Sequence, residues 1–270
     1  SNGSSIIASS IDGTAGNIAF EVGTFRSNVG ADGSPLIGAA PVTIASTSTG
    51  QGGAGTISIT GNAGKPADAV LLSKTHIVTG VSNAADPTVT PGNIELTAQR
   101  VELTNGTSLR ADTTGGADAG AITLNVETLK TQAGPEGRVL ISSDSNCSGQ
   151  CLGGQAGYIT IQGIPGFTPS ATRLYRHVTT PDSEPDRAIT YYFAQELDFN
   201  GTDIHSNAIG NAPGGIVMMR TQGRVSFTDT NVSVATQDFT INDNKPNGQP
   251  AQNQGFSRID IMARDIVLKD

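Results

Sequence analysis

Apolar and polar residues alternate in short segments throughout the chain, and one such segment recurs. Four of its copies read GTISIT (55–60), GNIELT (92–97), GAITLN (120–125) and GYITIQ (157–162). In each copy a Gly stands two residues before an Ile, and a second apolar residue follows two positions after that Ile. Because successive side chains of a strand point to opposite faces, this spacing predicts a short strand with one buried face.

The recurring Ile defines a repeat unit. An apolar or aromatic residue follows it by two positions in all eight copies, and Gly precedes it by two in six of them. The eight positions are Ile18, Ile57, Ile94, Ile122, Ile159, Ile189, Ile216 and Ile259. Intervals between them range from 27 residues (Ile189 to Ile216) to 43 (Ile216 to Ile259), which indicates a short basic unit with insertions. Such irregular spacing argues against helical solenoids, whose paired helices need more uniform lengths.

Each unit contains three alternating segments separated by turns. RVELTNGTSLRADTTGGADAG (100–120) aligns with ELDFNGTDIHSNAIGNAPG (196–214), and both carry Asn-Gly-Thr after the second segment. Three short strands per unit, stacked on the next unit at the ~4.8 Å spacing of hydrogen-bonded strands, predict a parallel β-helix. Inward Ile residues would then rest on one another, and we expect the Gly before each strand to supply a corner with positive φ.

Composition agrees with many short strands. The 270 residues include 34 Gly, only 4% aromatic residues and no Trp. Gly costs about 1 kcal/mol per helical position relative to Ala, so long helices are disfavoured. A net charge of −8 argues against nucleic acid as a partner. Because no run of ~18 apolar residues is present, we expect no membrane span.

The stretch GNIELTAQRVELTNGTSLRADTTGGADAGAITLNVETL (92–129) resembles the repeats of filamentous-haemagglutinin-like exoproteins of two-partner secretion systems. Those repeats share the Gly-Asn-Ile-x-Ile strand, the Val/Leu-x-Leu strand, the Asn-Gly turn and the closing Gly-x-Gly-x-Ala-Gly, whose last element also appears in TGQGGAGTISI (49–59). The likeness covers roughly 40–165 and returns, degraded, over 188–270. The family's N-terminal secretion domain is not found in this sequence.

The resemblance implies a right-handed parallel β-helix that is secreted or held at the bacterial cell surface. We therefore expect residues 1–270 to form one all-β solenoid segment of roughly seven to eight coils, a piece of a longer exoprotein, with an insertion at about 162–187. The expected function is non-catalytic adhesion or surface structure. Expected partners are a host or cell-surface glycan or protein, or further copies of the chain in an extracellular fibre.

The clearest interruption of the repeat is QGIPGFTPSATRLYRHVTTPDSEPDRAITYYFAQELDF, 162–199. Repeat proteins often carry function at such interruptions. Aromatic faces stack on sugars or partner side chains, and Arg and carboxylates fix polar groups, so this segment is a candidate contact site. The candidate residues are Phe167, Arg173, Tyr175, Arg176, His177, Asp182, Glu184, Asp186, Arg187 and Tyr192. Alternatively, Tyr191 and Phe199 point into the core, and the rest packs the insertion onto the rod.

Other chemistry is weakly indicated. Glycoside hydrolysis needs two carboxylates at a defined separation, and PDSEPDR (181–187) with Asp198 supplies acids without a pair that recurs on one face. A polysaccharide-degrading enzyme is thus a further alternative. Cys147 and Cys151 are spaced for a small disulfide in an oxidising compartment. We expect no cofactor and no metal site, with calcium at the turns 112–118 or 242–244 as the alternative.

Overall fold

The computed structural model describes residues 3–84, 89–146, 154–175, 187–209, 214–237 and 257–269. These residues form 25 strands and one short 3-10 turn, η1 (Asn62–Gly64), and contain no α-helix. Within the same ranges, no helix is both long and apolar enough to cross a membrane. The fold is all-β, as the alternating pattern predicts.

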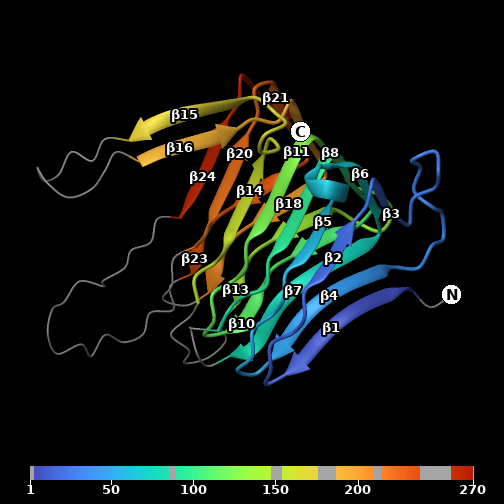
Figure 1. Cartoon of the computed structure of the whole chain (residues 1–270), viewed down its shortest axis with the longest axis vertical. Coiled ribbons are helices and arrows are strands. Elements are labelled where there is room, and N and C mark those ends of the chain that lie inside the picture. Colours follow the sequence, from blue (N-terminus) through green and yellow to red (C-terminus); the bar gives the residue numbers. More distant parts are fainter. Residues whose placement is uncertain are drawn as a thin grey trace, which may run out of the picture.

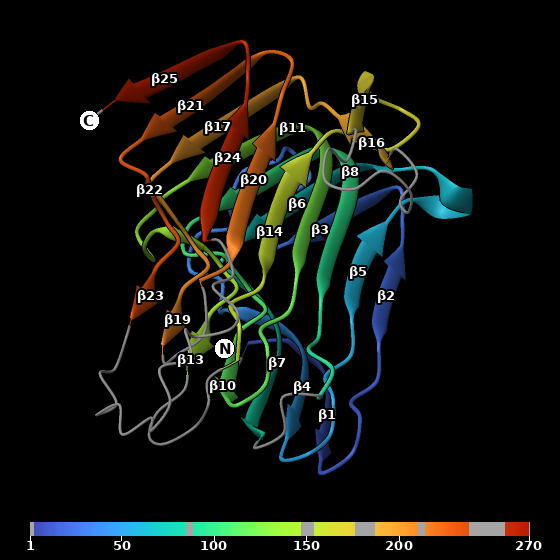
Figure 2. The same ribbon diagram turned by 90° about the vertical axis from the view of Figure 1, so that its left-hand side faces the viewer.

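One 12-stranded sheet holds the first two segments of each repeat unit. Its Gly-x-Ile segments are β2 (Ile18–Glu21), β5 (Ile57–Thr60), β8 (Ile94–Thr104), β11 (Ile122–Gln132), β14 (Tyr158–Gln162), β20 (Ile216–Arg220) and β24 (Arg258–Met262), which lie side by side in that order (Figure 2). Its second segments are β3 (Thr24–Ser27), β6 (Ala67–Ser73), β17 (Glu196–Asn200), β21 (Arg224–Thr228) and β25 (Asp265–Lys269). They join the same sheet because β8 and β11 are long enough to carry both segments.

The third segments form an 11-stranded sheet. Its strands are β1 (Ser5–Ile11), β4 (Val42–Thr49), β7 (Thr75–Ala84), β9 (Ser108–Arg110), β12 (Val139–Ser142), β18 (Thr202–His205) and β22 (Asn231–Ser233), with β10 (Thr113–Gly115), β13 (Ser145–Asn146), β19 (Ala208–Ile209) and β23 (Thr236–Gln237). Pairing within both large sheets is parallel, and residues of the two sheets share one hydrophobic core (Figure 1). This arrangement is consistent with a β-helix-like solenoid.

The predicted Ile ladder is confirmed along most of the molecule. Strand register pairs Ile18 with Ile57, Ile57 with Ile94, Ile94 with Ile122, and Ile122 with Ile159. The last four of these five side chains are fully buried. Burying one such side chain stabilises the fold by roughly 1.5–3 kcal/mol, so the four buried positions together contribute on the order of 10 kcal/mol of burial free energy.

Two predicted ladder positions are wrong. Ile159 pairs with Val217, and Val217 with Ile259, so Val217 takes the inward place expected for Ile216. Ile189 belongs to no ladder, because its strand pairs antiparallel within an insertion. The segment GGIVMMR contains four consecutive apolar residues, and alternation alone therefore does not define which pair faces inward.

The Gly before each Ile is required by space and not by positive φ, which corrects the expectation from sequence. A Cβ on Gly55, Gly120 or Gly157 would lie only 2.3, 1.7 or 1.9 Å from the carbonyl oxygen of the equivalent Gly one unit earlier. None of these three residues has a positive φ. The stacked residues, called the glycine column below, are Gly16, Gly55, Gly92, Gly120, Gly157 and Gly215.

Hydroxyl side chains of the other sheet close this corner. Ser46 Oγ donates to Gly16 O at 2.9 Å, and Ser206 Oγ donates to Gly157 O at 2.7 Å. Because a glycine leaves no side chain between the sheets, the hydroxyl can reach the backbone directly. Next to the glycine column, the space between the two sheets therefore contains backbone and small polar side chains.

The Asn-Gly turn is the corner where positive φ does occur. Asn105 and Gly106 have φ of 53° and 74°, and the matching turn uses Gly201 at 60°. Turn Asn and Asp side chains also bind the next unit: Asn105 Oδ1 accepts the Glu136 N–H at 2.9 Å, and Asp112 Oδ1 accepts the Asp144 N–H at 2.9 Å. These contacts give Asn105 and Asp112 a structural role in their turns, and the turn 242–244 lies outside the described residues.

Candidate binding groove

The interruption at 162–199 forms an antiparallel hairpin that projects from the stack (Figure 1). Its strands are β15 (Ser170–Tyr175) and β16 (Arg187–Tyr192). Register places Arg173 opposite Ile189 and Tyr175 opposite Arg187. The excursion therefore includes β16, and the chain rejoins the large sheet only at β17.

Five of the ten predicted contact residues lie within the described part of the chain. Phe167 is 58% exposed and Tyr192 is half-buried, while Arg173, Tyr175 and Arg187 lie on the two hairpin strands. The remaining candidates lie outside the described residues, as do both cysteines of the expected disulfide. They are Arg176, His177, Asp182, Glu184 and Asp186, and Cys147 and Cys151.

The base of the hairpin is packed onto the large sheet. Tyr191 is buried, and the Arg220 guanidinium lies 4.6 Å from the centre of its ring. Arg220 also donates to Gln162 Oε1 at 2.8 Å, which ties the hairpin to the two strands beneath it. Phe199 is an inward core residue, as the alternative predicted, and Tyr191 is also buried, although its strand pairs only within the hairpin. At least the base of the insertion is therefore structural.

A second interruption of the repeat, which the sequence alone did not predict, builds a groove. Residues 28–41 form a loop that leaves the 12-stranded sheet after β3 and enters the 11-stranded sheet at β4. Asn28 Nδ2 donates to Ala40 O at 2.8 Å and closes the base of this loop, and Gly30 N–H donates to Ser34 O at 2.9 Å within it. These bonds hold the segment 33–39 over the outer face of the large sheet.

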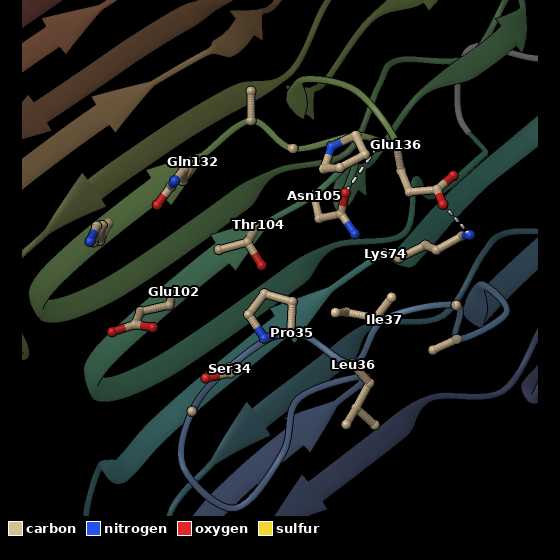
Figure 3. Close-up of a pocket in the computed structure, with 17 residues that line it drawn as sticks. Ser34, Pro35, Leu36, Ile37, Lys74, Glu102, Thr104, Asn105, Gln132 and Glu136 are labelled. Carbon is tan, nitrogen blue, oxygen red and sulfur yellow. Dashed lines mark hydrogen bonds and ion pairs between the residues drawn. The ribbon is translucent and has the colours of Figure 1, made fainter.

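The groove between this loop and the sheet has a volume of about 590 Å³, within the usual range of ligand sites. Figure 3 shows Ser34, Pro35, Leu36 and Ile37 of the loop across from residues of the sheet and its turns. The sheet side is lined by Lys74, Glu102, Thr104, Asn105, Lys130, Gln132 and residues 133–136. These residues come from three successive repeat units, so the groove exists only in the stacked fold.

Polar groups on the sheet side are partly fixed and partly available. Lys74 Nζ and Glu136 Oε1 form a 2.7 Å ion pair across two units, which fixes one end of the groove (Figure 3). Lys130 and Gln132 have no side-chain partner among the described residues, and Glu102 has only a 3.7 Å contact with Arg100. An amine, an amide and a carboxylate are thus free to contact a ligand.

The loop side is apolar and contains no aromatic ring. Leu36 is half-exposed and Ile37 fully exposed, and Pro35 stands beside them. No aromatic residue lines the groove on either side. An extended chain with one apolar and one polar face matches these walls better than a sugar ring, which binds best to a flat aromatic face.

The sequence gives only a weak indication of this groove. The stretch SNVGADGSPLIGAAP (27–41) breaks the alternation and places exposed Leu36 and Ile37 between turn residues. The sheet side leaves no local signal, because Lys74 and Glu136 are 62 positions apart in the chain. Only the stacking of repeat units brings them together.

A polar cluster lies on the outer face of the other sheet. His205 Nδ1 is 2.8 Å from Asp144 Oδ2, and this interaction raises the pKa of His205 above its ordinary value, against an opposing effect of burial. Ser142 Oγ donates to both oxygens of Asp112 at 2.8 and 2.9 Å. Among the described residues no group of three or more His, Cys, Asp or Glu side chains is arranged to hold a metal ion.

Comparison with known proteins found no relative of this chain. No family model matches the chain, and neither a curated protein nor a solved structure matches it.

Proposed function

We propose that this chain is a segment of a filamentous-haemagglutinin-like exoprotein that is secreted or displayed on the bacterial surface and acts in adhesion or surface structure without catalysis. The observation that carries the proposal is the in-register stacking of one repeated strand motif. The Gly-x-Ile strands pair in order through the long parallel sheet, as the resemblance of the repeats implies. Such a scaffold suits display of a binding surface along a rod.

The finer architecture is part of the same proposal. We take the two sheets as the walls of a right-handed parallel β-helix of seven to eight coils, because strand–crossover–strand connections in parallel sheets are almost always right-handed. The turn acids support a structural role more than a catalytic one. Asp112 and Asp144 accept backbone N–H groups of the neighbouring unit at 2.9 and 2.7 Å.

The groove is the proposed contact site, and its occupant is an extended segment of a partner protein. Leu36 and Ile37 would cover an apolar side chain of that segment, while Lys130 would bind an acidic one. Gln132 would hydrogen-bond its backbone. The three units that line the groove span roughly 10 Å, enough for about three extended residues.

The test uses short probe peptides, because the natural partner is not identified. The ¹⁵N-labelled chain is titrated with capped tetrapeptides that place Leu beside Asp or, in a second series, Leu beside Lys. We expect the Leu-Asp series to shift resonances of the loop and of Gln132, and Lys130→Glu to weaken that binding at least tenfold. Lys65→Glu makes the same charge change at an exposed turn outside the groove and should change the affinity less than twofold.

The groove assignment fails if neither peptide series perturbs the loop or if both lysine variants behave alike. Selection of the Leu-Lys series would also contradict it, because the free amine of Lys130 repels a basic side chain.

Self-association into a fibre is the second candidate, favoured by apolar residues at the two outermost strands. Ile11 on β1 is 83% exposed and Leu268 on β25 is 76% exposed, and among the described residues each of these strands is paired on one edge only. Electron microscopy of natively purified material over a concentration series separates the candidates. Filaments that lengthen with concentration would establish the fibre, whereas short rods of fixed length would favour display of a binding surface.

A further inference from the structure

Tyr158, at the start of β14, lies on the outer face of the large sheet with 50% of its surface exposed. It lines a small pocket of about 260 Å³ together with Asn93, Asp118, Ala121 and Gln155. The residues come from three successive repeat units and belong neither to the groove nor to the hairpin. The pocket surface is mostly apolar, with a few side chains that donate and accept hydrogen bonds, the combination that is typical of small-ligand sites.

Two polar side chains around Tyr158, those of Asn93 and Asp118, are held in fixed orientations. Asn93 Oδ1 accepts the Ala121 N–H at 2.8 Å, so the two hydrogens on its Nδ2 are directed away from that backbone. Asp118 Oδ1 accepts the Gln155 N–H at 2.7 Å, and its other oxygen stays available as an acceptor. In the described part of the chain, Asn93 Nδ2 and the exposed Gln155 amide have no partner.

The ligand that fits these groups is a sugar. A pyranose has an apolar C–H face that packs on an aromatic ring, and its hydroxyls both donate and accept. Here Asn93 and Gln155 supply donors, and Asp118 supplies an acceptor. The Asp118 carboxylate opposes an anionic sugar, and the pocket is less than half the size of the groove, which suits one ring.

We propose that the Tyr158 pocket binds one neutral pyranose unit of a glycan. This inference goes beyond the proposed function, which assigns a protein segment to the groove, and it depends on different residues. The sugar C–H face packs against the ring of Tyr158, and the hydroxyls at the ring edge bind Asn93, Asp118 and Gln155.

Saturation-transfer NMR on the whole chain provides the test. The probes are the methyl glycosides of glucose, galactose, mannose and N-acetylglucosamine, with methyl glucuronide as the anionic comparison. We expect transfer to at least one neutral glycoside, strongest at the ring protons of one sugar face, and little to the glucuronide. Absence of transfer to every neutral probe, or preference for the glucuronide, overturns the proposal.

Variants assign the signal to this pocket. Tyr158→Ala should weaken binding about tenfold or more, while Tyr158→Phe keeps the aromatic face and should stay within about threefold. Phe167→Ala removes another exposed aromatic side chain, outside the pocket, and should leave binding unchanged. An unchanged far-UV spectrum and melting temperature show that Tyr158→Ala is folded. Equal loss in the Phe167 and Tyr158 variants would overturn the assignment.

The groove variant separates this inference from the proposed function. Lys130→Glu should leave glycoside binding unchanged, and Tyr158→Ala should leave peptide binding unchanged. Failure of the peptide titration alone removes the groove assignment, whereas failure of the glycoside titration alone removes the sugar site.

Discussion

The glycine column and the outer row that contains Lys130 run along the same stack of strands. Residue type is constant in the column and varies from unit to unit in the outer row. From Gly55 onward the column admits only Gly, because each Cβ position is occupied by the carbonyl of the preceding member, whereas Gly16 has no preceding member. In the outer row each register partner is a different residue type. From β3 to β25 the row reads Arg26, Leu71, Glu102, Lys130, Asp198, Ser226 and Val267.

The difference shows which positions of this fold can carry functional side chains. An inner position contacts its own equivalent one unit away, so a residue that fits once fits in every unit. At an outer position the register partner can be a different residue type, as where Ser226 Oγ donates to Asp198 Oδ1 of the preceding unit. Distinct chemistry, such as the Lys130 amine or the Tyr158 ring, therefore collects on the outside.

The sharpest test of this contrast lies within the column. Gly120→Ala would place a Cβ 1.7 Å from Gly92 O, and the backbone of two sheets would have to move. We expect a loss of about 5 kcal/mol or more in the free energy of unfolding, measured by urea denaturation.

Gly16→Ala is the matched control for this change. A Cβ there meets only Ala8 Cβ at 3.9 Å, an ordinary contact, so the same substitution should change stability by less than about 0.5 kcal/mol. Equal effects at Gly16 and Gly120 would show that conformational freedom, and not space, selects glycine in the column.

Removal of a large core side chain should have the next largest effect. Phe199 is fully buried and stacks on Phe227 with ring centres 5.3 Å apart. Phe199→Ala should cost about 3–5 kcal/mol through lost burial and the resulting cavity. Phe167→Ala, on the outside, should cost less than about 1 kcal/mol in the same denaturation experiment. A small effect at Phe199 would mean that the ladders are not continuous through the hairpin insertion.

Two outer histidines should give the smallest effects, with opposite signs. The raised pKa of His205 means that its stabilising contribution is fully present below about pH 6.5 and is lost as pH rises through the raised value. Burial, with a smaller contribution from Arg110, lowers the pKa of His76. Stability from neutral His76 is therefore present above about pH 6.5 and is lost as pH falls through the lowered value.

Unfolding free energies from pH 5 to 8 would check both signs. His205→Gln should remove a loss of stability that occurs toward high pH, and His76→Gln should remove one that occurs toward low pH. Each change should be within about 1 kcal/mol. If both variants alter the profile in the same direction, the contact between His205 and Asp144 is not the cause.

The sequence predicts the inside of the molecule much better than its outside. Spacing alone places Ile57, Ile94 and Ile122 in one ladder, because a period of two residues is a local property. The requirement for glycine at position 120 does not arise within its own segment, because the atom that excludes a side chain there is the carbonyl oxygen of Gly92. A local pattern also misplaced Ile189, because a strand of the hairpin alternates in the same way as a strand of the stack.

The candidate sites depend on contacts that no single segment contains. The groove needs Lys74 and Glu136, and the sugar pocket needs Asn93 beside Tyr158. Their sequence separation hides both sites until the registers are known. The predicted contact residues do not include Tyr158, and five of the ten lie outside the described ranges, so that prediction stays untested.

The glycine column also constrains how the length of such a chain can change during evolution. A residue gained or lost between two column members is tolerated in a turn, as the unequal intervals show, whereas a shift at the column itself would place a side chain against a carbonyl. Deletion of residues 92–119 would instead bring Gly120 onto Gly55 and β11 onto β5 and β6. Whole repeats are therefore the modules that recombination can remove or duplicate while every remaining glycine keeps an equivalent neighbour.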